Sequence, residues 1–320
     1  MKKIFFALIA VVAMASCSKD EVIEVNREQI GFGEAFVDNG TRADYSSGKS
    51  IDAFKVYGTL KGNGNTVQIF NGANVTRPTD LASGVYDQTK AWICNEVQYW
   101  VPSAEYNFAA IVDGVATATE GLPATIPFTV ADGVDNKDLL YATATVTTNA
   151  NAEPITGVND KDFVAFTFDH LLSKVQFTVA NEMATNYSIK VTGITVTGAK
   201  KDGLYTIGTE NSTWTTTTED TVPSLTFGTT GVIESANTAG ASETRQILPV
   251  EQTLAVTIAY DINYKGTKVA STTKTGKISQ SFVKNTVYNI TAKIDATKIQ
   301  FSVESVGGFN PSTGGDITIQ

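Results

Sequence analysis

The sequence IGFGEAFVDNGTR, residues 30–42, joins an extended apolar segment to a polar turn. Ile30 and Phe32 are separated by one glycine, and this alternation predicts one face of a half-buried β-strand. Asn39-Gly40 follows within the same stretch, and Asn-Gly is a strong turn signal. Arg42 is therefore expected in an exposed loop, where proteases cut folded chains. The simpler interpretation is that Arg42 is one solvated side chain among many.

Beyond this stretch, short alternating apolar segments predict an all-β chain. Turn residues separate them at intervals of roughly 8–12 residues, a spacing that is typical of a sandwich or barrel. No stretch has the pattern of a long amphipathic helix. The Thr-rich residues 212–221 are weakly patterned and predict an exposed hairpin or loop. The expected strands lie near residues 54–58, 67–69, 91–100, 106–111, 139–142, 163–168, 175–179, 189–196, 254–258, 287–294, 299–303 and 317–319.

The length of 320 residues is enough for two domains. Residues 149–162 form a polar connector that contains Pro and Gly, which predicts a domain boundary. We therefore expect an N-terminal β-sandwich over residues 43–160 and a C-terminal β-sandwich over residues 161–320. The strand expected at residues 163–168 would open the second series.

The N-terminus has the pattern of an export signal. Two lysines precede an apolar run at residues 4–12, which is far shorter than the roughly 20 residues that span a bilayer. Small residues then precede Cys17, an arrangement that resembles a bacterial lipobox, although Met14 stands where Leu is usual. Residues 1–16 are thus expected to be a lipoprotein signal peptide and residues 17–42 a lipidated leader. The alternative is an ordinary signal peptide with a chance cysteine.

The chain has two cysteines. Acylation of Cys17 would leave Cys94 as the remaining thiol, so no intramolecular disulfide could form. A free cysteine is among the most often buried residue types, and Cys94 lies in a strand-like run. We expect Cys94 in the core.

The search for catalytic chemistry is mostly negative, and no cofactor or metal is indicated. His170 is the single histidine, so a zinc site with two imidazoles is excluded. A structural role at a turn or strand end is the expected one for His170. The glycines occur in turns and form no phosphate-binding loop. The net charge of −9 argues against a nucleic-acid partner.

Two tryptophans have two interpretations. Trp92 and Trp100 could form a stacking platform for sugars, or they could fill the core of a sandwich. Core packing is the expected role of both. Sugar stacking stays open as the alternative.

Local motifs run along nearly the whole chain in a characteristic order. They are YWVP at residues 99–102 with YNFAA at 106–110, DLLYA at 138–142, FTFDHLLSKV at 166–175, ILP at 247–249 and IQFSV at 299–303. Together with the lipobox, these motifs resemble the fimbrillin family of Bacteroidales, the subunits of the type V pilus. One departure is Phe309, where family members often carry Trp.

The resemblance implies two transthyretin-like β-sandwich domains in tandem, in a lipoprotein precursor carried to the outer membrane through lipid on Cys17. It also implies cleavage by an arginine-specific protease and polymerisation with other fimbrillin subunits by donor-strand exchange. Carried onto this sequence, Arg42-Ala43 matches the cleavage site, and Ile30 and Phe32 match the strand that is released. The C-terminal residues 299–320 match the donor segment, whose alternating apolar residues are Ile299, Phe301, Val303, Ile317 and Ile319.

These expectations describe a non-enzymatic shaft or tip subunit of a surface fimbria that contributes to adhesion. A subunit that stays uncut would remain anchored by its lipid. The first alternative is a surface lipoprotein that binds glycans and does not polymerise. The second is a hydrolase that uses a pair of carboxylates, since many Asp and Glu residues are present.

Overall fold

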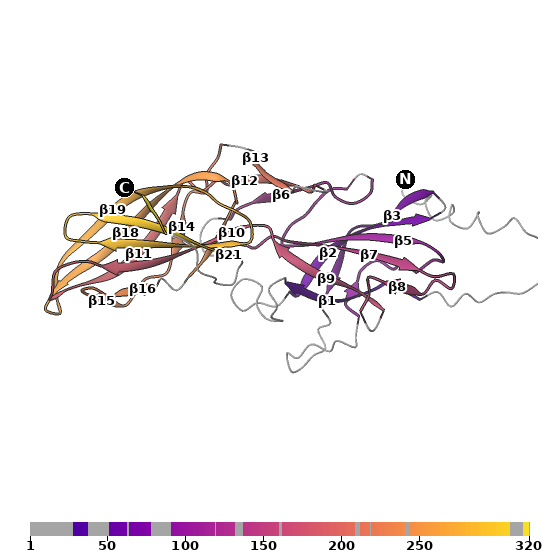
Figure 1. Ribbon diagram of the computed structural model, residues 1–320, viewed down its shortest axis with the longest axis horizontal. Helices are drawn as coiled ribbons and strands as arrows, with labels where there is room; N and C mark the ends of the chain where they lie inside the picture. Colours follow the sequence, from indigo (N-terminus) through magenta and orange to yellow (C-terminus); the bar gives the residue numbers. More distant parts are fainter. Residues whose placement is uncertain are drawn as a thin grey trace, which may run out of the picture.

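The computed structural model describes residues 28–37, 51–62, 64–77, 91–118, 120–131, 137–159, 162–208, 212–217, 219–240, 243–307 and 316–319. Every regular element in these ranges is a β-strand, which confirms the all-β prediction. The strands form two halves that follow one another along an elongated molecule (Figure 1). Over the same ranges, no helix is long and apolar enough to cross a membrane.

The N-terminal half is built on one eight-stranded sheet. β1 pairs with β9 in parallel, and the other neighbouring strands are antiparallel. In spatial order the strands are β1 (Gly31–Val37), β9 (Phe163–His170), β7 (Leu140–Thr148), β5 (Glu105–Val112), β2 (Ala53–Gly62), β3 (Asn65–Thr76) and β4 (Ile93–Cys94), with β8 (Pro154–Thr156) paired to β7.

The segment from residue 92 to residue 100 joins the two edges of this sheet. Within it, β4 pairs with β3 at the far edge. The same segment forms isolated bridges to the first strand, between Gln29 and Tyr99 and between Phe32 and Trp92. The sheet therefore folds over on itself and encloses a core, and β1 has neighbours on both sides. Joining the edges removes the unpaired backbone that an open sheet would present.

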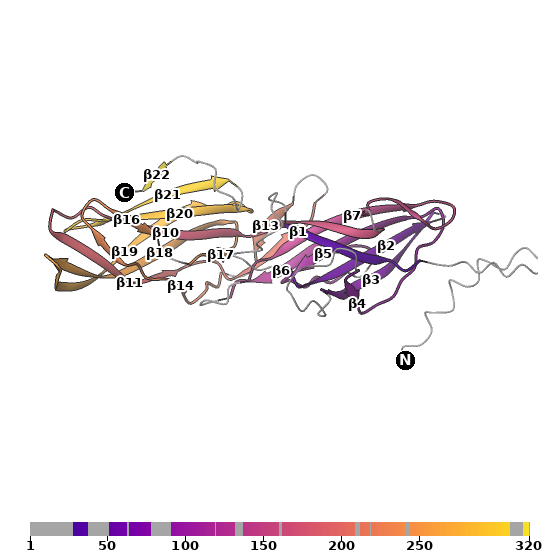
Figure 2. The ribbon, with the colours of Figure 1, turned by 90° about the horizontal axis from the view of Figure 1, so that it is seen from below.

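The C-terminal half consists of two sheets that face each other across a second core (Figure 2). Phe177 of the first sheet packs edge-to-face on Phe227 of the second, with ring centroids 4.7 Å apart. The first sheet contains β16 (Thr238–Gly240), β10 (Ser173–Asn181), β20 (Thr286–Ile294), β21 (Ile299–Gly307) and β22 (Asp316–Ile319), with β17 (Arg245–Ile247) paired to β10. The second contains β14 (Leu225–Phe227), β11 (Tyr187–Thr197), β18 (Glu251–Tyr264) and β19 (Thr267–Ser281), with β15 (Val232–Glu234) paired to β11.

The strand at residues 163–170, expected to open the second series, lies in the N-terminal sheet instead. β9 pairs with β1 and β7, and its buried Val164, Phe166 and Phe168 join the first core. The polar connector at residues 149–162 is thus a loop within the N-terminal half. The sheets change between His170 and Ser173, later than the boundary expected after residue 160.

A strand from the N-terminal half crosses to the other half. β6 (Thr125–Thr129) pairs with β12 (Asp202–Thr206), which pairs in turn with β13 (Thr213–Thr216). This three-stranded sheet lies between the two halves in Figure 1. β12 and β13 are consecutive antiparallel strands, so the Thr-rich region supplies one strand of a hairpin, as one of the two expectations had it.

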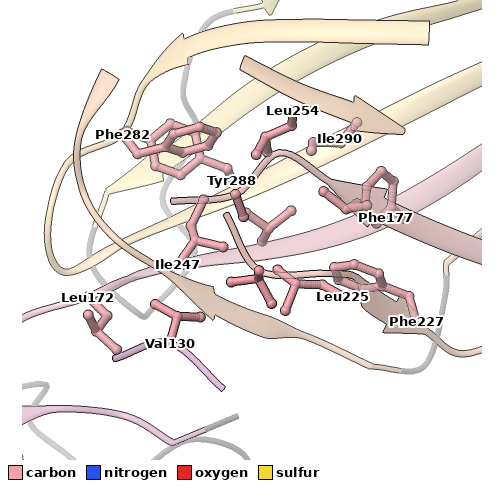
Figure 3. Packing of buried hydrophobic residues seen from close by; sticks show 14 of the residues in the cluster. Val130, Leu172, Phe177, Leu225, Phe227, Ile247, Leu254, Phe282, Tyr288 and Ile290 are labelled. Carbon is pink, nitrogen blue, oxygen red and sulfur yellow. The ribbon is translucent and has the colours of Figure 1, made fainter. Parts of the chain in front are cut away.

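The second core extends into the N-terminal half. Val130, which directly follows β6, belongs to the same buried cluster as Leu172 and Ile247 of the C-terminal half (Figure 3). The cluster also contains Tyr57 and Ile111 from the N-terminal sheet. The hydroxyl of Tyr57 donates to the carbonyl of Ala116 at 2.7 Å and accepts from its N–H at 3.0 Å. The second core is therefore built from residues of both halves.

Among the described residues, each half contains a tyrosine corner. The Val101 N–H donates to the hydroxyl of Tyr106 at 2.7 Å, and the Val283 N–H donates to the hydroxyl of Tyr288 at 2.9 Å. The matching sequences are WVPSAEYN at residues 100–107 and FVKNTVYN at residues 282–289. Each tyrosine ring packs against the aromatic residue that opens its motif, with centroids 4.8 and 4.7 Å apart. The same device thus positions β5 and β20.

Removal of either corner hydroxyl should destabilise the protein. Tyr106→Phe and Tyr288→Phe keep the ring but leave the valine N–H without its acceptor, so each should lower the free energy of unfolding by about 1–2 kcal/mol. Urea denaturation measures this loss. The exposed Tyr99→Phe is the matched control, and equal stability of all three variants would contradict the role of the corners.

Tyr141 should make the protein sensitive to alkali. Burial, with a smaller contribution from the nearby Tyr205, raises the pKa of Tyr141 to about 12. Between pH 10 and 12 the unfolded chain has lost this proton while the folded chain keeps it, so stability falls as pH rises. Tyr141→Phe should remove on the order of 2 kcal/mol of that fall. Urea midpoints of the wild type and of Tyr141→Phe at pH 9 and pH 12 measure this difference. An equal fall in stability in the two proteins would contradict the role of Tyr141.

Candidate functional site

The strand that carries Ile30 and Phe32 is held by backbone hydrogen bonds on both sides. On one side the Ile30 N–H donates to Gln98 O at 2.8 Å, and the Trp92 N–H donates to Phe32 O at 2.7 Å. On the other side β1 runs parallel to β9, from Gly31 opposite Phe163 to Val37 opposite Phe168. β1 is therefore an integral strand of the sheet.

The side chain of Phe32 fills an aromatic socket. It is fully buried, and Ile30 beside it is 2 % exposed. Four phenylalanine rings surround Phe32, each from a different strand, and three of them meet it edge-on while Phe166 stacks against it. Their centroid distances from Phe32 are 6.4 Å for Phe54 of β2, 5.5 Å for Phe70 of β3, 5.9 Å for Phe108 of β5 and 6.1 Å for Phe166 of β9. This one side chain contacts most of the strands that line the first core.

The opposite face of β1 is covered by Phe163. A Cβ atom placed on Gly31 would lie 2.7 Å from Phe163 Cδ1, and one placed on Gly33 would lie 2.9 Å from Phe163 Cβ. Real Cβ atoms do not approach this closely, so Phe163 can lie across β1 because both residues lack a side chain. Glycine at these positions is thus required by packing rather than by an unusual backbone angle.

These contacts define what β1 would leave behind if it were removed. β9 and the segment at residues 92–100 would each lose their backbone partners along one edge. The socket of Phe32 would be empty, with four rings around it. An unpaired double edge over an apolar groove is a surface that another strand can complete.

The two strands of the C-terminal segment, β21 and β22, differ in how they are paired within the sheet. In β21, Phe301 is 5 % exposed and Val303 is 1 % exposed, and both belong to the second core, with Ile299 packed against it. β21 pairs with β20 from Ile299 to Val306. β22 pairs with β21 alone, from Glu304 opposite Asp316 to Phe301 opposite Ile319, and so lies at the edge of the sheet.

The release of these strands would have unequal costs. Loss of β21 would remove Phe301 and Val303 from the core, and deletion of such buried side chains typically costs about 2–5 kcal/mol each. Loss of β22 would break pairing on one side only. β22, which carries Ile317 and Ile319, is therefore the strand that can leave at lower cost.

Trp92 and Trp100 do not form a sugar-stacking platform. Trp92 is 6 % exposed and Trp100 is fully buried, and both belong to the first core. Trp100 packs edge-to-face on Tyr106, and Trp92 packs on Phe54 at 5.4 Å. The alternative role in glycan stacking is wrong for this structure, because neither indole face is available to a ligand.

Two further residues that the sequence singled out have structural positions. His170 ends β9, and its Nδ1 lies 2.7 Å from Asp138 Oδ2 in a fully buried pair. Cys94 packs against the first core but is only partly buried, so it is less enclosed than expected. Burial still raises the pKa of its thiol. In the described part of the chain, no group of His, Cys, Asp and Glu is arranged to hold a metal ion.

Several predicted residues lie outside the described residues. They are the signal peptide at residues 1–16, the lipidation residue Cys17, the processing pair Arg42-Ala43 and Phe309, the departure from the family pattern. Sequence reasoning missed Phe163, because its contact with Gly31 and Gly33 joins residues far apart in the chain.

Residues 41–306 match the model of a family described as fimbrillin-like. The chain belongs to this family. A search of curated proteins gave no match for this fimbrillin-like protein. Among solved structures, it is similar to a fimbrial protein from Bacteroides vulgatus, with 18 % sequence identity and a TM-score of 0.58 over 88 % of this chain and 99 % of that one. It is also similar to a putative cell adhesion protein from Bacteroides uniformis, with 16 % identity and a TM-score of 0.53 over 88 % and 97 % of the two chains. At these identities the likeness shows the fold.

Truncation of the buried ring should destabilise the fimbrillin-like protein strongly. Phe32→Ala empties the socket between four strands and should lower the free energy of unfolding by about 3–5 kcal/mol. Urea denaturation followed by tryptophan fluorescence measures the loss. Ile93→Ala is the control, because this apolar side chain is 57 % exposed and should change stability by less than about 0.5 kcal/mol. Similar losses in the two variants would contradict the socket.

Proposed function

We propose that this protein is a structural subunit, shaft or tip, of a cell-surface fimbria and contributes to adhesion. Membership of the fimbrillin-like family supports the fimbrial role, and the similar solved structures are named as fimbrial and adhesion proteins. The subunit assembles when an arginine-specific protease cuts after Arg42, β1 leaves, and the C-terminal segment of another subunit takes its place.

The position of β1 is the observation that carries the proposal. It is paired on both sides, and it places Phe32, with Ile30 directly before it, in the first core. Its removal would create a groove that another extended apolar strand can fill. A cut after Arg42 would separate β1 from every strand that follows it in the chain. The cleaved strand would then be held by noncovalent contacts alone.

The C-terminal segment supplies the donor. Ile317 and Ile319 alternate with polar residues, and β22 occupies the edge of its sheet, where its release costs least. In this structure β22 pairs within the C-terminal half, away from the groove under β1. The segment can therefore serve a neighbouring subunit in a polymer.

The leader determines where assembly takes place. Lipid on Cys17 anchors the precursor at the outer membrane, since two or more acyl chains bind a bilayer durably. A cut after Arg42 separates the domains from this anchor. An uncut subunit stays attached and serves as the base of a fibre. The subunit acts without catalytic chemistry of its own.

Limited proteolysis tests the assembly model. The chain from Glu28 to Gln320 contains every residue that the structure describes and can be treated with an arginine-specific protease. We expect one cut, a new N-terminus at Ala43, and ladders of multimers in native mass spectrometry. Deletion of residues 316–320 should abolish the ladders while leaving the cut unchanged.

The other arginines of this chain provide internal controls. Arg245 is buried, and Arg77 is followed by Pro78 and lies 3.7 Å from Asp52. Neither should be cut while the protein is folded. An Arg42→Ala chain should stay intact and monomeric. A chain that is cut at Arg42 but remains monomeric would overturn the polymer model.

A further inference from the structure

The socket of Phe32 has the shape of an aromatic ring. Four phenylalanines surround it at centroid distances of 5.5–6.4 Å, and three of them present an edge-to-face geometry. Such ring pairs each contribute about 0.5–1.5 kcal/mol beyond the burial of apolar area. An aliphatic side chain in the same place would lose these contacts and leave unfilled volume.

The positions on either side of the socket require small residues. Phe163 lies against Gly31 and Gly33, and a Cβ atom at either glycine would come within 2.9 Å of it. The strand that fits the groove without displacing Phe163 therefore has the order aliphatic, small, aromatic, small. Ile30-Gly31-Phe32-Gly33 has this order.

The C-terminal strand of this chain lacks this order of residues. Its sequence is Ile317-Thr318-Ile319, which has no ring and has a β-branched residue at the intervening position. The nearest ring in the terminal segment is that of Phe309. Seven residues, among them Pro311 and two glycines, separate Phe309 from Ile317, so no aromatic residue lies two positions from Ile317 or Ile319 in the sequence.

β21 carries a ring but is not free to supply it. Ile299-Gln300-Phe301 has an aliphatic and an aromatic residue at the correct spacing. Phe301 is buried against Gly276 of β19, and β21 lies between β20 and β22. Transfer of β21 to another subunit would remove Phe301 from the second core of its own subunit in order to fill the first core of the other.

We propose that the groove under β1 selects donor strands with an aromatic residue two positions from an aliphatic one and a small residue between them. The matched partner of this chain is therefore a different subunit whose donor strand has this pattern. The chain's own terminal strand is the weaker donor. This inference rests on the proposed strand exchange and adds the specificity of the groove.

Competition between peptides tests the selectivity. The chain from Glu28, with a fluorophore on its N-terminus, is cut after Arg42, and displacement of the labelled segment 28–42 is followed by anisotropy. The competitors are the peptide of residues 311–320 and its Ile317→Phe and Ile319→Phe variants. One of these variants should bind about tenfold more tightly than the wild-type peptide, whichever direction the strand takes. Gln320→Phe adds the same ring one position after Ile319, on the other face of the strand, and should not increase the affinity.

The outcomes separate the inference from the proposed function. If the wild-type peptide displaces the labelled segment and neither ring variant improves on it, the selectivity is wrong while strand exchange stands. If a longer peptide that includes Phe309 loses affinity on Phe309→Ala, this chain already supplies a ring and the preference for a different subunit is overturned. If no C-terminal peptide displaces the segment, the donor role fails and so does the partner assignment.

The socket can also be tested in the uncut chain. Phe32→Ile puts an isoleucine in the socket, the residue type that the chain's own terminal strand would supply. The folding equilibrium constant should fall by at least about tenfold. Val164→Ile, at another buried position of the same core, is the control for a change of aliphatic shape. Full stability of Phe32→Ile would overturn the selectivity independently of any peptide.

Discussion

The N-terminal half depends on the two-sided pairing of one short strand. β1 lies between β9 and the segment at residues 92–100, and without it the sheet has two open edges above an apolar groove. The aromatic core is arranged around Phe32, whose ring contacts phenylalanines on four strands. A strand this central is normally protected by its covalent continuity with the rest of the domain. In the sequence, β1 is followed by the polar residues Asp38-Asn39-Gly40-Thr41-Arg42.

The two halves are joined by more than a linker. β6 leaves the N-terminal half to pair with β12, and residues from both halves share the second core. The buried pair of His170 and Asp138 lies where the chain passes from one half to the other. A shared core and a shared sheet resist bending at the junction, because any rotation would break hydrogen bonds and expose apolar surface. β1 and β22 lie in different halves, so this junction also fixes the position of one relative to the other.

The two halves also share a local motif, the tyrosine corner. WVPSAEYN and FVKNTVYN place an aromatic residue, a valine N–H and a tyrosine hydroxyl in the same arrangement, and Ser103 and Asn285 both have positive φ angles, of 50° and 54°. The similarity is local, because β5 has antiparallel neighbours on both sides whereas β20 pairs in parallel with β10. The same turn chemistry thus serves two different sheet topologies.

The sequence by itself determined the all-β class, the strands at Ile30–Phe32 and in the C-terminal segment, and the core role of Trp92 and Trp100. These features follow from alternation and turn residues, which act over a few positions. The tertiary structure alone decided that β9 pairs with β1, that β6 crosses to β12, and that Phe163 lies on Gly31 and Gly33. Parallel pairing and strand crossing join residues more than seventy positions apart, and local patterns carry no information about such partners. The boundary expected after residue 160 failed for this reason, since a polar loop within a sheet and a polar linker between domains have the same composition.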